Sequence, residues 1–166
     1  MVRGVDRYVS AAFSSRRFPL VLGGDCPIVL GCVRAARRHR GDIGLVHVDG
    51  HEDSYPPPLS PTGDWADSEF AFTLGISPFA WDAELLREQP LVDERHLVAI
   101  GPRDSADIAR HGAESIRPHV LVLAPEEVHD DPRASATEAL GRAGAAPGGF
   151  WLHLDWTCSP TKRCPP

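Results

Sequence analysis

The chain has 166 residues, 42% of them hydrophobic and 24% charged, which suits one globular domain with its own core. Its formal net charge is −6, so no general electrostatic attraction draws it to nucleic acid or to an anionic membrane, and neither is an expected partner. No apolar run is long enough to span a membrane, and the chain starts without an apolar leader. The cysteines Cys26, Cys32, Cys158 and Cys164 form no CxxC pair, so a reducing cytoplasm is the expected compartment.

Nearly continuous runs of Val, Leu and Ile predict strands that are buried on both faces of a parallel sheet. These runs lie at 18–22, 43–48, 96–100, 119–123 and 150–154. Helix-like segments alternate with them at 27–38, 81–89, 105–110 and 133–143, and a leading helix is expected at 5–15. Alternation of this kind predicts right-handed βαβ crossovers. The expected fold is a three-layer α/β/α domain over residues 1–155 with a mainly parallel sheet, incomplete at its C-terminus, followed by an irregular tail at 156–166.

The segment from Gly50 to Asp67 interrupts this alternation. It contains Pro56, Pro57, Pro58, Pro61 and Gly63, which exclude a helix or the interior of a strand. Loops of this length inside a compact domain are usually functional or disordered.

Residues that commonly bind metals follow three of the expected strands. Asp25 follows the first, Asp49, His51 and Asp53 follow the second, and Asp155 follows the last. Sites in open α/β sheets form beyond the carboxyl ends of the strands, and alternate residues of an extended segment point to one side. A single acidic residue at such a place is usually a helix cap or a turn former. The carboxylate–x–His–x–carboxylate pattern favours a metal site over a solvated acidic loop.

Three segments resemble a known family, the arginases and agmatinases. Residues 19–26, Pro-Leu-Val-Leu-Gly-Gly-Asp-Cys, are similar to the Gly-Gly-Asp-His segment of these enzymes, with Cys26 in place of the histidine. Residues 44–53 resemble their Asp-Ala-His-x-Asp motif, and residues 150–155 resemble the strand that leads into their Asp-x-Asp motif. The resemblance covers about residues 18–75 and 150–155, and it is only architectural between them.

This resemblance implies an arginase-like fold and a ureohydrolase activity that converts a guanidino or amidino substrate to urea and an amine. It implies two Mn²⁺ ions as cofactors, with Asp49 and Asp155 bridging them. His51 would bind one ion and Asp53 the other, and Cys26 stands at a further ligand position. His51 and Asp53 are also the expected catalytic residues. The two metals would lower the pKa of a water that attacks the guanidinium carbon.

Several positions depart from the family pattern. Thr157 stands where the second aspartate of Asp-x-Asp is expected, so one metal loses a carboxylate and the chain as written is expected to be impaired. Tyr55 and Ala66 stand where arginases place a substrate-binding asparagine and a proton-shuttling histidine, which argues against L-arginine as the substrate. Within this loop, Tyr55, Ser60 and Asp67 are the candidate substrate-binding residues.

Three residues near the expected site, a cysteine and two histidines, each have two interpretations. Cys26 is either a metal ligand, which would favour zinc or iron over manganese, or a small buried thiol that binds nothing. His47 and His153 each precede a ligand aspartate by two residues. They are either partners that orient the ligands or hydrogen-bonded core histidines, and the second interpretation is the simpler one.

The tail suggests a shifted reading frame. With G/C-rich codons, one nucleotide inserted after the Asp155 codon makes the next codons read Val-Asp-Val-Leu, which restores the second aspartate. The hypothesis is that residues 156–166 are out of frame and that the chain is truncated.

Three functional interpretations follow. The first is an amidine hydrolase with a binuclear metal site. The second is a non-catalytic fragment or pseudoenzyme of the same fold that acts as a metal-binding or oligomerisation module, and a homo-oligomer is compatible with both. A nucleotide-binding Rossmann domain is the third and weakest, because Gly23-Gly24-Asp25 is not the GxGxxG fingerprint.

Overall fold

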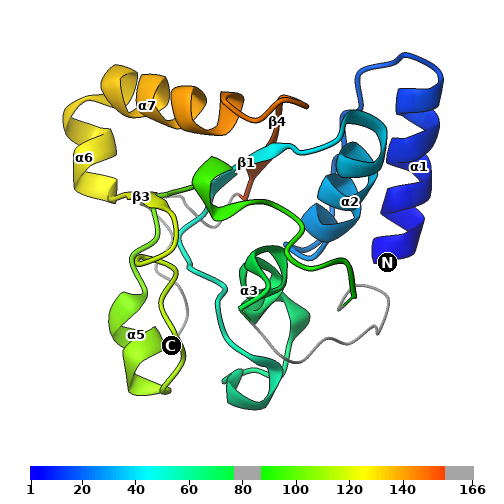
Figure 1. The fold of residues 1–166 in the computed structure, drawn as a ribbon. Helices are drawn as coiled ribbons and strands as arrows, with labels where there is room; N and C mark the ends of the chain where they lie inside the picture. Colours follow the sequence, from blue (N-terminus) through cyan, green and yellow to red (C-terminus); the bar gives the residue numbers. More distant parts are fainter. Residues whose placement is uncertain (77–86, 156–166) are drawn as a thin grey trace.

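Four parallel strands form the central layer in the computed structural model, which describes residues 1–76 and 87–155 (Figure 1). The strands are β1 (Gly44–Val48), β2 (Leu97–Ile100), β3 (Leu121–Leu123) and β4 (Phe150–Leu154). Their spatial order is β3-β2-β1-β4, and each adjacent pair is parallel. Residues that follow β1 and β4 therefore leave the sheet at the same edge, side by side.

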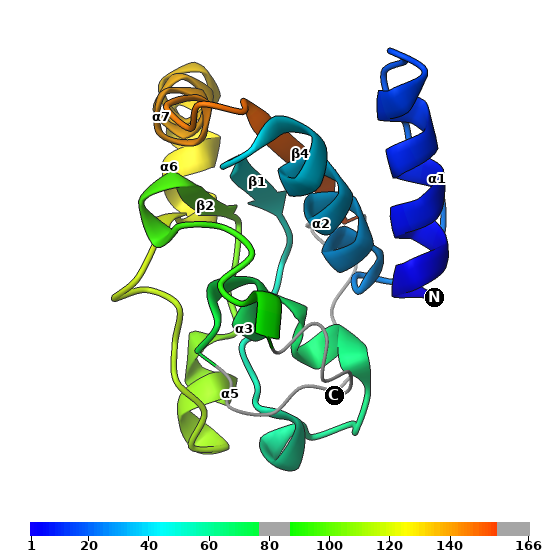
Figure 2. The ribbon, with the colours of Figure 1, turned by 45° about the vertical axis from the view of Figure 1, so that its right-hand side comes forward.

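Helices cover both faces of this sheet (Figure 2). On one face α7 (Pro132–Gly144), with the short α6 (Pro125–Asp130) before it, packs Ala139 and Ala143 in a cluster with Val46 and Val98 of the sheet. On the other face α2 (Ile28–Arg40) and α3 (Glu69–Leu74) share a larger core with Leu45. The expected three-layer α/β/α architecture is confirmed, because alternate residues of β1, β2 and β3 enter opposite cores.

Helix α1 (Val2–Ser14) packs against α2, which begins immediately after Pro27. The two helices approach closely at Gly31, where an added Cβ would lie 2.6 Å from the carbonyl oxygen of Val2. Basic residues fill the last turn of α2, at 37–40, where positive charge favours the helix dipole. This packing fixes the N-terminal end of α2, which carries Cys26 just before it.

The remaining elements are short. They are α5 (Ser105–Arg110) and three 3-10 turns, η1 (Pro57–Leu59), η2 (Trp65–Asp67) and η3 (Glu94–His96). The segment from Gly50 to Asp67 contains only η1 and η2, as its prolines predict. Within the described residues, no helix has the length and apolar character that crossing a membrane requires.

The structure differs from the prediction for one element and does not describe most of another. The strand predicted at 18–22 is wrong: this segment is unpaired, and Phe18, Leu20 and Leu22 are 90%, 74% and 84% exposed. β1 has neighbours on both sides, and the segment does not pair with the open side of the edge strand β4 either. The helix predicted at 81–89 falls mostly on residues 77–86, which lie outside the described part of the chain.

Candidate metal centre

The register of β1 and β4 brings two of the expected ligands together. His47 lies opposite His153 in this parallel pair, so Asp49 and Asp155 both follow the carboxyl ends of neighbouring strands. The pairing continues one step further, because the backbone N–H of Asp155 donates to the carbonyl of Val48 at 2.9 Å. Regular pairing between β1 and β4 therefore places the two aspartates, which are distant in sequence, close together in space.

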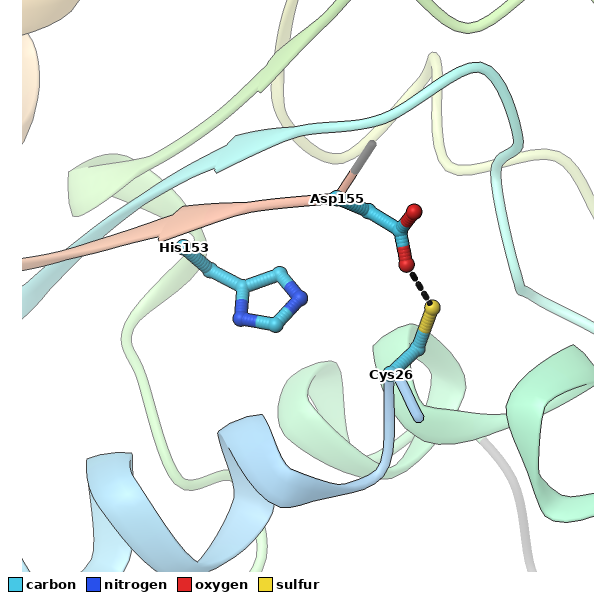
Figure 3. Close-up of side chains that lie close together, drawn as sticks. All are labelled: Cys26, His153 and Asp155. Atoms are coloured by element: carbon cyan, nitrogen blue, oxygen red, sulfur yellow. Dashed lines mark hydrogen bonds between the residues drawn. The ribbon is translucent and has the colours of Figure 1, made fainter. Parts of the chain in front are cut away.

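Cys26 reaches the same point from the turn before α2. Gly23 and Gly24 have φ values of 119° and 77°, which only glycine adopts easily, and they direct the chain back toward the sheet edge. The thiol Sγ lies 2.7 Å from Oδ2 of Asp155 and 3.6 Å from Oδ2 of Asp49. Figure 3 shows the thiol of Cys26, on the turn before α2, close to the carboxylate of Asp155 at the end of β4 and to the ring of His153 on that strand.

Asp53 enters the cluster from the loop after β1. Its φ is 44°, a left-handed conformation that is uncommon for residues other than glycine. Helix α3 holds it there, because the N–H groups of Phe70 and Ala71 donate to the carbonyl of Asp53 at 3.1 and 3.3 Å. The strained backbone thus directs a buried carboxylate, 6% exposed, toward the other ligands.

Potential ligand atoms of these residues lie within 4.8 Å of one another in two sets, Cys26–Asp49–Asp53 and Cys26–His153–Asp155. Burial and the neighbouring carboxylates raise the pKa of the Cys26 thiol well above its usual range. Burial also raises the pKa of Asp53. Both shifts express one physical fact, that negative charge is concentrated where water cannot screen it.

This donor set fits a divalent cation. Oδ2 of Asp53 and Nε2 of His153 are buried and have no hydrogen-bond partner among the residues that the structure describes. Such atoms are normally paired, since desolvation without a partner is costly. Carboxylates suit Mn²⁺, imidazole suits several first-row metals, and a thiolate favours the softer ones. A bound cation would offset the carboxylate charge that disfavours the Cys26 thiolate.

His51 lies at the margin of this cluster. Its side chain is 31% exposed, and Nδ1 lies 3.3 Å from Oδ1 of Asp49, which also accepts from the backbone N–H of His51 at 3.1 Å. It belongs to none of the close ligand sets found among the described residues. The predicted roles of His51 as a metal ligand and a catalytic residue stay predictions. Thr157, at the expected position of the second aspartate, lies outside the described residues.

The candidate substrate residues hold their loop together. The hydroxyl of Ser60 donates to Oδ2 of Asp67 at 2.5 Å, and the backbone N–H of Tyr55 donates to the carbonyl of Asp67 at 2.9 Å. The Tyr55 ring is buried, with its centroid 5.8 Å from that of His111. A cavity of about 380 Å³ is lined by residues that include Asp25, Asp64 and Trp65. Asp25 immediately precedes Cys26 in the sequence. The substrate-binding role of Tyr55, Ser60 and Asp67 remains a prediction.

Sequence reasoning missed Glu69. Glu69 is fully buried at the start of α3, in a segment that is otherwise apolar except for Thr73. His47 and His153 are core residues as expected, and their Nε2 atoms have no hydrogen-bond partner within the described residues. An acidic residue inside an apolar helical run was the available signal.

Fold and site together define a parallel α/β protein with a cluster of metal-type ligands at the carboxyl ends of two adjacent strands. The sequence profile described as "Arginase family" matches residues 1–157, and the chain therefore belongs to the arginase family.

Individual relatives agree with this assignment. An arginase of Staphylococcus aureus is 35% identical over 101 residues, which is 60% of this chain and 32% of that protein. The arginase structure from Bacillus cereus superposes with a TM-score of 0.73 at 24% identity, covering 91% of this chain and 51% of the other. A hypothetical agmatinase from Burkholderia thailandensis gives 0.65 at 18% identity, covering 91% and 40%. The chain thus spans about a third of the curated relative and half of the arginase structure.

Proposed function

We propose that the chain is a ureohydrolase-type enzyme, or the metal-binding part of one, that hydrolyses a C–N bond of a linear amidine at a binuclear manganese site. The observation that carries this proposal is the convergence of Cys26, Asp49, Asp53 and Asp155 from three separate segments at one sheet edge. Membership of the arginase family supports the reaction class.

Asp49, Asp53, Asp155 and Cys26 would hold one cation, and His51 with Asp49 and Asp155 would contribute to the second. Bound divalent cations lower the pKa of water and stabilise the negative charge that develops in hydrolysis. Oδ1 of Asp49 accepts from the backbone N–H of His51, which holds this carboxylate in place without a metal. The exposed part of the His51 ring is placed to exchange protons with solvent, which supports its catalytic role.

The charge of the site supports a cationic substrate. A guanidinium or amidinium group is planar and positive, and the cluster presents several buried carboxylates to it. A cavity of about 380 Å³ is lined by both signs of charge, Asp25 and Asp64 together with Arg3 and Arg34. A substrate that carries a carboxylate as well as a guanidinium group would match such a lining.

Metal-loaded protein tested against guanidino acids and guanidino amines of different chain length checks this function. Urea and amine release should appear for at least one compound and should disappear in Asp49→Ala together with a bound cation. Asp107→Ala, a change to an exposed aspartate of α5, is the matched control and should preserve both. Metal binding without turnover of any compound would instead identify a non-catalytic metal-binding member of the family. An unchanged metal content in Asp49→Ala would show that the site is wrong.

A further inference from the structure

A second group of buried ligand-type residues lies beneath the first. Atoms of His47, Asp53 and Glu69 lie within 4.8 Å of one another, and Nε2 of His47 is 3.7 Å from Oε1 of Glu69. The three residues are 1%, 6% and 0% exposed. Only Asp53 is shared with the candidate metal centre described above, and neither His47 nor Glu69 has a role there.

Contacts with the rest of the fold do not account for this group, although the carboxyls of Asp53 and Glu69 lie close enough to share a proton. Nε2 of His47, Oδ2 of Asp53 and both carboxyl oxygens of Glu69 have no hydrogen-bond partner in the described part of the chain. Glu52 is equally buried but differs. Its Oε2 accepts from the Ser115 hydroxyl at 2.7 Å and from the Ile116 N–H at 3.0 Å, and its Oε1, which has no hydrogen bond, lies 3.3 Å from the cationic Nε of Arg117. A buried acid normally has such partners, and Glu69 has a histidine and an aspartate instead.

We propose that His47, Asp53 and Glu69 form a further divalent-cation site, in addition to the proposed binuclear centre, which shares Asp53 with the set Cys26–Asp49–Asp53. One imidazole nitrogen and two carboxylates suit borderline first-row cations such as Mn²⁺ and Zn²⁺. Asp53 carries two carboxylate oxygens and can therefore contact a cation on each side. The proposal does not rest on the hydrolase function, since it requires only that these three residues bind metal.

The surrounding structure holds these ligands in place. Asp53 and Glu69 are tied together through the backbone, because the carbonyl of Asp53 accepts from the first N–H groups of α3. The ring of His47 is fixed between the edge of Phe70, at a centroid distance of 5.1 Å, and the parallel ring of His153, at 4.9 Å. A cation at this site would join β1 to α3 and would sit deeper in the protein than Cys26 and Asp155.

Counting bound ions tests the proposal. Protein stripped with a chelator is dialysed against Mn²⁺ or Zn²⁺, and metal per chain is measured by elemental analysis. Glu69→Gln should bind one ion fewer than the unmodified protein. Glu52→Gln, the matched change at an equally buried glutamate, should bind the full number. Cys26→Ala should keep the ion that depends on Glu69, which separates this site from the proposed catalytic centre whether or not hydrolysis is found.

Thermal unfolding guards against misfolding of the variants. Glu69→Gln keeps the size of the side chain, so its metal-free Tm should stay close to that of the unmodified protein, while the rise in Tm on adding metal should shrink. Electron paramagnetic resonance with Mn²⁺ gives a second test. An ion bound through Asp53 and Glu69 would add to any spin coupling within the proposed catalytic centre, so Glu69→Gln should change the spin-coupled signal of the unmodified protein. Equal ion counts and identical spectra in Glu69→Gln and the unmodified protein would show that the three residues form a buried carboxyl–imidazole cluster and no metal site.

Discussion

His47 and His153 lie directly opposite each other on β1 and β4, with their rings stacked at a centroid distance of 4.9 Å and an interplanar angle of 17°. Burial, together with the neighbouring His153, lowers the pKa of His47 to about 4, so its ring is uncharged at neutral pH. A neutral ring offers a nitrogen lone pair, which is the form that binds metals. Because His47 and His153 are paired in register, Asp49 and Asp155, which come two residues later in the sequence, lie side by side at the carboxyl ends of the two strands.

Cys26 should decide which metal the protein prefers. A thiolate donor favours Zn²⁺ over Mn²⁺, and an imidazole at the same position, which is a harder ligand than a thiolate, should reduce this preference. We expect Cys26→His to weaken Zn²⁺ binding relative to Mn²⁺ by about tenfold or more, a typical effect of altering a metal's surroundings. Competition dialysis with both ions measures this ratio.

Spectroscopy with Co²⁺ tests the same ligand directly. Co²⁺ bound through the thiolate of Cys26 should give a sulfur-to-metal charge-transfer band in the near ultraviolet, and Cys26→Ser should lack it. Cys32, which is also buried but lies in α2 packed against α1, serves as the control position. A band that survives in Cys26→Ser and disappears in Cys32→Ser would contradict the assignment.

L-Arginine should be a poor substrate. The Tyr55 ring is buried against His111, and Ala66 has no titratable group, so the loop lacks the asparagine and histidine that the arginase pattern places there. We expect urea release from L-arginine far below the range of about 1–10³ s⁻¹ that is typical of enzymes. A colorimetric urea assay with Mn²⁺- or Zn²⁺-loaded protein measures it, and turnover within that range would contradict the prediction.

The ion pair between Glu88 and Arg34 should make stability depend on pH. Nε and Nη2 of Arg34 donate to the Glu88 carboxylate at 2.6 and 2.7 Å, which holds the pKa of that carboxyl below its usual value of 4.5. A carboxyl with a depressed pKa stabilises the fold above its unfolded pKa, and this stability is lost as pH falls through the folded pKa. We expect Glu88→Gln to lower the free energy of unfolding by about 1 kcal/mol at pH 7, because the side chain is 34% exposed and partly screened.

Denaturant titrations of metal-free protein at several pH values check this prediction. The difference between Glu88→Gln and the unmodified protein should be largest near neutral pH and should shrink steadily below pH 4.5. Glu138→Gln, a change to an exposed glutamate on α7, should show no comparable pH-dependent loss. A constant difference down to strongly acidic pH would mean that the pair does not titrate as described.

Two glycines in helices should respond oppositely to alanine. At Gly31 an added Cβ would lie 2.6 Å from the Val2 carbonyl and 2.9 Å from the Val5 Cβ, so Gly31→Ala should separate α1 from α2 and lower stability by about 1–3 kcal/mol. At Gly141 in α7 no atom lies within 4 Å, so Gly141→Ala should raise stability by up to about 1 kcal/mol through helix propensity alone. Thermal or chemical unfolding distinguishes the two, and equal effects would contradict the close approach.

Hydrophobic runs and strand-end residues predicted much of this fold. The strands expected at 43–48, 96–100 and 150–154 are confirmed within a residue at each end. The first two are buried runs in a parallel sheet, whereas Phe150, Leu152 and Leu154 of the third are exposed. The run at 18–22 has the same composition, but its apolar side chains remain exposed. Composition shows that a segment can pair, but it does not show whether the fold places that segment in register beside a strand.

The candidate site likewise contains residues that the sequence located and one that it did not. The positions of Asp49 and Asp155 follow from strand ends, which sequence patterns locate well. Glu69 could not be placed in the same way, because it follows no strand and reaches the cluster only through the fold of the loop that begins at Asp53. Its burial depends on where α3 docks, and that depends on packing between elements distant in sequence.

The contact between Cys26 and Asp155 spans 129 residues of sequence, and it closes the cluster with the side chain that follows β4. β4 pairs only with β1 among the described strands, so a cation held by both residues would act as a reversible cross-link between this edge strand and the start of α2. Such a link should suppress local unfolding of β4, whose amides would otherwise open most readily. Hydrogen exchange of residues 150–155 should therefore slow when metal is added, while exchange in the interior of α7 should change little.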